Sequence, residues 1–203
     1  MRRYEIHAVG LGGMGVIQLS KLITKAAVMH ENKLAVQTEA YSASARGGKS
    51  WADVVIELDP DEPMIDYPKA LAPYDFVFVL SEEAASSVKK DDIKEDGWVL
   101  WDPSIITRFR TATKVPSLAI PAQDIGIREF GEAIIGSSIL FGAFCSLSGV
   151  ISKEAAEQTL TASVPKKSIE QNMQAFEKGW GLGEQRKLEP RVQAKPSKET
   201  AGE

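Results

Sequence analysis

The sequence predicts an α/β domain, a Rossmann-like variant with a central, largely parallel sheet flanked by helices on both faces and a disordered C-terminal tail. Short apolar runs typical of strands alternate along the chain with segments of helical periodicity. A glycine-rich loop separates the first strand from the first helix, as at the start of many doubly wound sheets. The 203 residues are 43% hydrophobic and 26% charged, which is the composition of a globular chain.

The N-terminal segment has the pattern of a β-loop-α-β unit. Residues 4–9 read as a strand, residues 10–15 as the glycine loop, and residues 16–30 as a helix whose apolar positions recur at helical spacing. Residues 33–38 read as the next strand. This order predicts the opening of a parallel sheet with a right-handed crossover.

The middle of the chain departs from that order. Residues 39–50 are small and polar, leave no room for a packing helix, and are expected to form a structured loop of the kind that carries function. A strand follows at 51–58, then a turn-rich segment at 59–73. The continuous apolar run 76–80 is typical of a strand buried on both faces.

The C-terminal half contains the remaining predicted elements. Ser81 is expected to cap a short helix, and strands follow at 98–101 and 117–120. A long apolar helix is expected over 129–148. Two more helices are expected at 153–161 and 168–178, with Ser152 and Ser168 as their caps. We assign residues 1–183 to a single domain and 184–203, which are polar and contain two prolines, to the tail.

Residues 133–152 carry no charged side chain and must be weighed as a membrane span. Gly136 and Gly142 interrupt the run, and Gly149 is expected to end the helix after about 16 residues, short of the ~20 that cross a bilayer. The segment is therefore predicted to be a core helix. A net charge of −4 argues against a general nucleic-acid binder. The single cysteine, Cys145, allows no internal disulfide and no iron–sulfur cluster, and favours a cytoplasmic location.

The glycine loop has two readings. Gly10, Gly12 and Gly15 fit G-x-G-x-x-G between a strand and a helix, the context of a dinucleotide fingerprint, and Gly13 adds a further glycine. Glu39, after the second expected strand, could then bind a ribose hydroxyl. In the alternative reading, the glycines only let the helix pack closely on the sheet. No catalytic residues and no metal ligands stand out.

The second motif is the segment Tyr41-Ser-Ala-Ser-Ala-Arg46-Gly47-Gly48. An arginine before two glycines can present its guanidinium to a phosphate or a carboxylate. Arg46 could equally anchor the loop to its own domain or to a partner chain, or be an ordinary surface arginine. These readings stay open at the level of the residues.

Taken together, the two glycine motifs resemble those of the gamma subunit of 2-oxoacid:ferredoxin oxidoreductases, of the pyruvate, 2-oxoglutarate or 2-oxoisovalerate type. The strand 76–80 and the C-terminal pattern Lys167-x4-Asn172-x2-Ala175-Phe176-x2-Gly179 are also similar to that family. Two departures are that Met14 stands where the family usually has Gln, and that no Ala-Asn pair precedes the long apolar helix.

The resemblance implies a subunit of a complex that oxidatively decarboxylates a 2-oxoacid to acyl-CoA, CO2 and reduced ferredoxin. Thiamine diphosphate, [4Fe-4S] clusters and coenzyme A then act at the level of the complex, with none bound by this chain alone. The expected partners are alpha, beta and ferredoxin-like delta subunits, and the isolated chain, expected to be inactive, could pair with itself through exposed apolar surface. We expect Tyr41, Arg46, Gly47 and Gly48 to face a partner chain or coenzyme A, with the glycine loop nearby. The alternatives are a self-sufficient dinucleotide-binding oxidoreductase and an indolepyruvate-type subunit.

Overall fold

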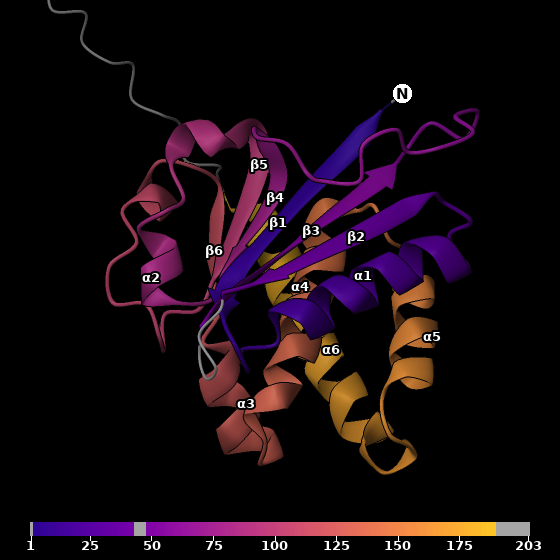
Figure 1. Ribbon diagram of the computed structural model, residues 1–203. Coiled ribbons are helices and arrows are strands. Elements are labelled where there is room, and N and C mark those ends of the chain that lie inside the picture. The colour runs from indigo at the N-terminus through magenta and orange to yellow at the C-terminus, as the bar shows by residue number, and fades with distance from the viewer. Residues whose placement is uncertain (1, 43–47, 190–203) are drawn as a thin grey trace, which may run out of the picture.

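The computed structural model describes residues 2–42 and 48–189, and its centre is a six-stranded sheet in the order β2-β3-β1-β4-β5-β6 (Figure 1). The strands are β1 (Arg3–Leu11), β2 (Ala35–Tyr41), β3 (Lys49–Glu57), β4 (Tyr74–Val79), β5 (Ile93–Trp101) and β6 (Ser117–Ala119). Strands β1, β4, β5 and β6 run parallel, which confirms the predicted α/β class.

Strand β3 makes the sheet mixed, because it pairs antiparallel with both β1 and β2. Strands β1 and β2 therefore run in the same direction, as predicted, but they are separated by β3. The loop expected over 39–50 is shorter than predicted, since β2 continues to Tyr41 and β3 begins at Lys49. A connection this short has no room for the crossover that a parallel neighbour needs, so the next strand pairs antiparallel with β2.

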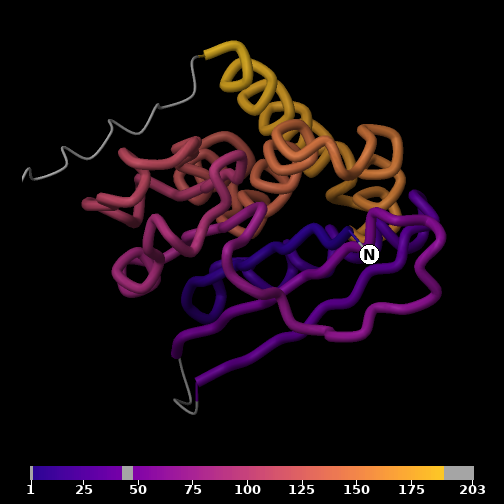
Figure 2. Tube along the Cα trace, turned by 90° about the horizontal axis from the view of Figure 1, so that it is seen from above, coloured from indigo at the N-terminus to yellow at the C-terminus, as the bar shows by residue number. Residues whose placement is uncertain are grey.

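Helices cover the two faces of the sheet unequally. The helices are α1 (Val16–His30), α2 (Glu82–Ala85), α3 (Ala122–Phe130), α4 (Gly136–Ser148), α5 (Lys153–Ser163) and α6 (Ile169–Leu188). Side chains of α1, α4, α5 and α6 share one buried cluster with one sheet face, and α2 with the segment around Phe109 covers part of the other. Figure 2 shows α5 and α6, in orange and yellow, on the opposite side of α1 from the purple strands β2 and β3.

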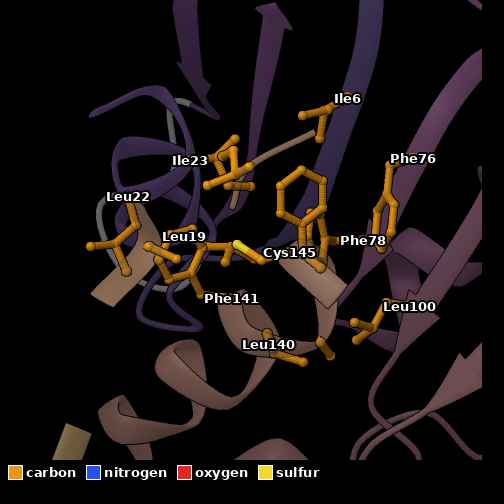
Figure 3. Packing of buried hydrophobic residues seen from close by; sticks show 14 of the residues in the cluster. Ile6, Leu19, Leu22, Ile23, Phe76, Phe78, Leu100, Leu140, Phe141 and Cys145 are labelled. Carbon is orange, nitrogen blue, oxygen red and sulfur yellow. The ribbon is translucent and has the colours of Figure 1, made fainter. Parts of the chain in front are cut away.

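Helix α4 is the centre of the larger core. Its Phe141, Phe144 and Cys145 are fully buried, and Figure 3 shows Cys145 among side chains that include Leu19 of α1 and Phe78 of β4. A Cβ atom on Gly142 or Gly179 would collide with backbone of the opposing helix, so α4 and α6 touch backbone to backbone. The segment is thus a core helix, as predicted, and no helix of the described residues is long and apolar enough to cross a membrane.

The helix expected over 129–148 begins later than predicted, because residues 129–130 are the end of α3 and α4 starts at Gly136. Gly131 has φ +80°, and the amides of Gly131 and Glu132 donate to carbonyls of the last turn of α3, which ends that helix. Ser81 and Ser152 cap α2 and α5 as predicted, with hydroxyls that accept from the amides of Ala84 and Ala155. Ser168 precedes α6, but its hydroxyl donates to the carbonyl of Pro165 and caps nothing.

Helix α6 continues ten residues beyond its expected end at 178, past the predicted start of the tail at 184. Arg186 explains the extension, because its Nε donates to the carbonyl of Ser117 at 2.8 Å and its guanidinium lies 5.3 Å from the centre of the Trp98 ring. The ordered helix therefore includes residues 184–188. The rest of the predicted tail, from 190 onward, lies outside the described residues.

Candidate functional site

The glycine loop begins at the carboxyl end of β1, where ligands bind in open α/β sheets. Gly13 and Gly15 have φ angles of +90° and +79°, which only glycine adopts freely. Gly10 has another role, since a Cβ there would lie 2.8 Å from Cγ2 of Val16 and 3.2 Å from Cβ of Leu80. The loop thus serves turn geometry and close packing at once.

The structure brings the two predicted glycine motifs into contact. The amide of Gly12 donates to the carbonyl of Gly48 at 3.0 Å, and Leu11 lies opposite Lys49 in the antiparallel pairing of β1 with β3. Tyr41, at the end of β2, is 62% exposed. Arg46 and Gly47 lie outside the described residues. One corner of the sheet therefore carries every described residue of both motifs.

The space beside the glycine loop is small. A cavity of about 50 Å³ lies between the loop, the ends of β4 and β5, and the start of α4. Its walls come from the chain itself and include Met14, Ile134 and Leu140. Asp102, buried at the same place, is satisfied by the amides of Ser104 and Gln123. A cavity of this volume has room for a few water molecules and is too small for the pyrophosphate of a dinucleotide.

Glu39 does not occupy the position of a ribose-binding acid. It lies within β2, and β3 separates it from β1 by two strand spacings, about 10 Å. Its carboxylate accepts from the Tyr41 hydroxyl at 2.7 Å and pairs with Lys21 at 3.2 Å. The hydrogen bond from Tyr41, followed by the contacts with Lys21, lowers the pKa of this carboxyl. The dinucleotide-site reading of Gly10, Gly12, Gly15 and Glu39 is therefore not supported by the geometry.

A larger cavity, which the sequence did not indicate, lies on the opposite face of the sheet. It measures about 280 Å³ and is lined by His7, Trp51, Glu83 and Ser87, among others. His7 Nδ1 lies 2.6 Å from Oδ1 of Asp53, which is only 2% exposed. The ring of Tyr74 stacks on His7 with 4.7 Å between centroids, and burial, with the Asp53 charge second, raises the pKa of its phenol.

Cys145 is a core residue, as predicted. Its side chain is fully buried, and that burial raises the pKa of the thiol well above its ordinary value. A thiol in this state is neither a nucleophile nor a metal ligand. Among the described residues, the glycine-motif corner offers packing and backbone contacts and no acid–base constellation.

Comparison with known proteins gives one consistent family. Residues 5–182 match the family described as pyruvate ferredoxin/flavodoxin oxidoreductase. The 2-oxoglutarate synthase subunit KorC of Methanocaldococcus jannaschii is 38% identical over 184 residues, covering 90% of this chain and 95% of the relative. Subunits named for indolepyruvate oxidoreductase are more distant, at 28% identity and below.

Solved structures show the same fold. A keto/oxoacid ferredoxin oxidoreductase gamma subunit from Geobacter sulfurreducens superposes with a TM-score of 0.75 at 31% identity, covering 90% of this chain and 97% of that one. A 2-oxoglutarate:ferredoxin oxidoreductase from Magnetococcus marinus, with 2-oxoglutarate, coenzyme A and succinyl-CoA bound, contains the fold in 31% of its chain. That match covers 90% of this chain, with a TM-score of 0.76 at 21% identity. The chain therefore belongs to the pyruvate ferredoxin/flavodoxin oxidoreductase family, as a gamma subunit of the 2-oxoacid:ferredoxin oxidoreductases.

Proposed function

We propose that this gamma subunit serves an enzyme whose 2-oxoacid is 2-oxoglutarate. The observation that carries the proposal is the likeness to 2-oxoglutarate synthase subunits, four of which are between 32% and 38% identical to this chain. A pyruvate synthase subunit reaches only 26%. The reaction is the oxidative decarboxylation of the 2-oxoacid to an acyl-CoA, with CO2 and reduced ferredoxin as the other products.

In this proposal the chain contributes no catalytic group and shapes the complex around other subunits. One buried cysteine does not suit an iron–sulfur cluster, and the cavity of about 50 Å³ beside the glycine loop is too small for thiamine diphosphate at that place. Thiamine diphosphate, [4Fe-4S] clusters and the site of carbon chemistry then belong to the alpha, beta and ferredoxin-like delta subunits, and the complex is cytoplasmic. The corner with Gly12, Tyr41 and Gly48, together with Arg46 and Gly47, faces a partner chain or coenzyme A.

The substrate is tested on the whole complex. We expect anaerobic purification of this chain from its native cells to recover a thiamine-binding chain and a cysteine-rich chain. The recovered complex should reduce a viologen dye with 2-oxoglutarate at a kcat/KM at least about tenfold above that for pyruvate or indolepyruvate. A preference for pyruvate or indolepyruvate overturns the proposal that 2-oxoglutarate is the substrate. Recovery of this chain alone overturns the proposal that it works within a complex with these partner subunits.

The role of the corner is tested separately with Arg46→Ala. The variant should keep the fold of the isolated chain but weaken assembly or acyl-CoA formation. Arg128→Ala is the matched control, because the Arg128 side chain is 75% exposed and pairs with Asp124 on its own helix. Equal assembly and turnover of the two variants argues against a docking role for Arg46.

A further inference from the structure

The two edges of the sheet are built differently. The β6 edge is three residues long, and Arg186 donates to the carbonyl of Ser117 there, so little backbone is left to pair. The β2 edge is seven residues long and has neither proline nor lysine. Its register with β3 contains no bulge. Natural edge strands usually carry one of these protections, because an open edge invites another strand.

The hydrogen bonds at the two ends of β2 show which of its groups are free. The amide of Glu57 donates to the carbonyl of Leu34, and the amide of Ser42 donates to the carbonyl of Lys49. In an antiparallel ladder every second residue pairs, so the even-numbered residues between them bond to β3. The odd-numbered residues direct their amides and carbonyls away from β3, and no described residue accepts from these amides or donates to these carbonyls. These residues are Ala35, Gln37, Glu39 and Tyr41.

Side chains along the same strand hold this edge in an extended form. The Gln37 amide donates to Oγ of Ser20 and to Oε1 of Glu39, both at 2.8 Å. The Tyr41 hydroxyl donates to the other oxygen of Glu39, and Lys21 of α1 pairs with that carboxylate. A strand fixed in this way loses little conformational entropy when a second strand pairs with it.

The geometry points to a second copy of this chain as the occupant of the β2 edge, with two β2 strands antiparallel across a twofold axis at Thr38. In this register Ala35 lies opposite Tyr41 of the other copy, and Gln37 lies opposite Glu39. The four outward residues of each copy then form about eight hydrogen bonds between chains. The amide–carboxylate and Thr–Thr neighbours are both favourable cross-strand pairs.

The neighbouring registers of the two β2 strands give less favourable cross-strand pairs than the register centred on Thr38. A shift of the axis to residue 39 places the two Glu39 carboxylates opposite each other, and a shift to residue 37 places Tyr41 opposite Lys33, which lies outside β2. An isologous contact of this kind closes at two copies. It joins the two six-stranded sheets into one of twelve strands. The inference does not depend on the proposed substrate, and it places self-association on a strand edge instead of on the exposed apolar surface expected from the sequence.

The test is the mass of the full chain in solution, measured by sedimentation velocity over a range of concentrations. We expect a dimer at high micromolar concentration. Gln37→Glu, which sets carboxylate against carboxylate, should raise the dissociation constant at least about tenfold. The double variant Gln37→Glu with Glu39→Gln restores the complementary pair and should recover dimerisation. Gln171→Glu on the exposed surface of α6 adds the same charge and should leave the mass unchanged.

Hydrogen exchange provides a second readout that does not depend on mass. The amides of Gln37 and Glu39 should be protected in the dimer and lose that protection on dilution, while the amides of Val36 and Thr38 stay protected. A wild-type chain that is monomeric at all concentrations overturns the inference. A dimer that is indifferent to Gln37→Glu, or exchange at residues 37 and 39 that does not respond to dilution, also overturns it.

Discussion

The imidazole of His7 and the carboxylate of Asp53 meet at 2.6 Å across the β1–β3 pair, 46 positions apart in the chain. We expect Asp53→Ala to leave His7 Nδ1 without its partner and to lower the free energy of unfolding by about 1–3 kcal/mol. Urea denaturation of His7→Ala, Asp53→Ala and the double variant measures the coupling, which should exceed about 0.5 kcal/mol. Strictly additive effects of the two substitutions would show that the contact contributes nothing.

Two glycines of helix α6, Gly179 and Gly181, should respond in opposite ways to substitution by alanine. A Cβ on Gly179 collides with the backbone of Ile139 in α4, whereas a Cβ on Gly181 meets no atom within 4 Å. We expect Gly179→Ala to cost at least about 2 kcal/mol because the helices must separate. Gly181→Ala should gain about 0.5–1 kcal/mol from the better helix propensity of alanine. Equal effects of the two variants in thermal unfolding would contradict the close helix contact.

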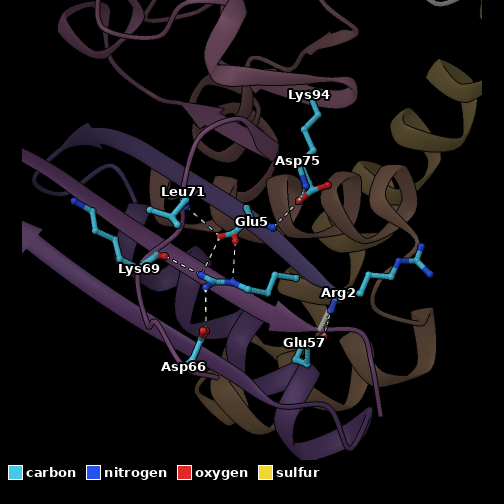
Figure 4. A network of polar contacts seen from close by, with 9 residues as sticks. Arg2, Glu5, Glu57, Asp66, Lys69, Leu71, Asp75 and Lys94 are labelled. Atoms are coloured by element: carbon cyan, nitrogen blue, oxygen red, sulfur yellow. Dashed lines mark hydrogen bonds and ion pairs between the residues drawn. The ribbon is translucent and has the colours of Figure 1, made fainter. Parts of the chain in front are cut away.

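Glu5 makes stability depend on pH. Its carboxylate accepts from the amide of Leu71 and pairs with Arg3 at 2.9 Å, which ties the 58–73 loop to β1 (Figure 4). Burial is the largest influence and raises the pKa of this carboxyl above its ordinary value of 4.5, although the Leu71 amide and Arg3 oppose the shift. The folded state therefore holds this proton more tightly than the unfolded state does.

The raised pKa of Glu5 sets the direction in which the free energy of unfolding changes with pH. The protonated Glu5 carboxyl contributes its full stability below pH 4.5, and this contribution is lost as the pH rises through the higher pKa of the folded state. We expect the unfolding free energy of the wild type, taken relative to Glu5→Gln, to fall across that window. Urea titrations at a series of pH values measure the difference. If the wild type minus Glu5→Gln difference in unfolding free energy stays constant or rises with pH, the pKa of Glu5 is not raised in the folded state.

The end of α6 is tested by shortening the chain. A chain that stops at residue 189 should unfold at the same urea concentration as the full chain. One that stops at 183 loses the bond from Arg186 to Ser117 and its contact with Trp98. We expect that loss to cost about 1–3 kcal/mol, and Arg186→Ala in the full chain to reproduce most of it. Identical midpoints for all of these chains would place residues 184–188 outside the cooperative unit.

Features set by neighbouring residues were predicted correctly from the sequence. The strand 76–80 and the caps at Ser81 and Ser152 follow from apolar runs and hydroxyl placement, which act over a few positions. The glycine loop was located for the same reason. The family resemblance also came from local motifs, and the comparisons confirm it.

Features that depend on distant partners were missed. The place of β3 between β1 and β2 is fixed by pairing across the sheet, and the length of α6 by Arg186 reaching Ser117. The break at Gly131 was hidden because the apolar pattern continues through it. At the candidate site, the His7–Asp53 pair and the cavity beside it depend on strand register, which no local pattern reveals. Arg46 and Gly47 remain predictions.

The backbone contact between α4 and α6 has a mechanical consequence. With no side chains between them at Gly142 and Gly179, the two helices cannot slide or rotate against each other without atomic overlap. Helix α4 begins beside the glycine loop, and α6 ends on the β6 edge through Arg186. If a partner chain displaces the glycine loop, α4 either stays in place or moves together with α6. In the second case the movement reaches the β6 edge on the far side of the sheet.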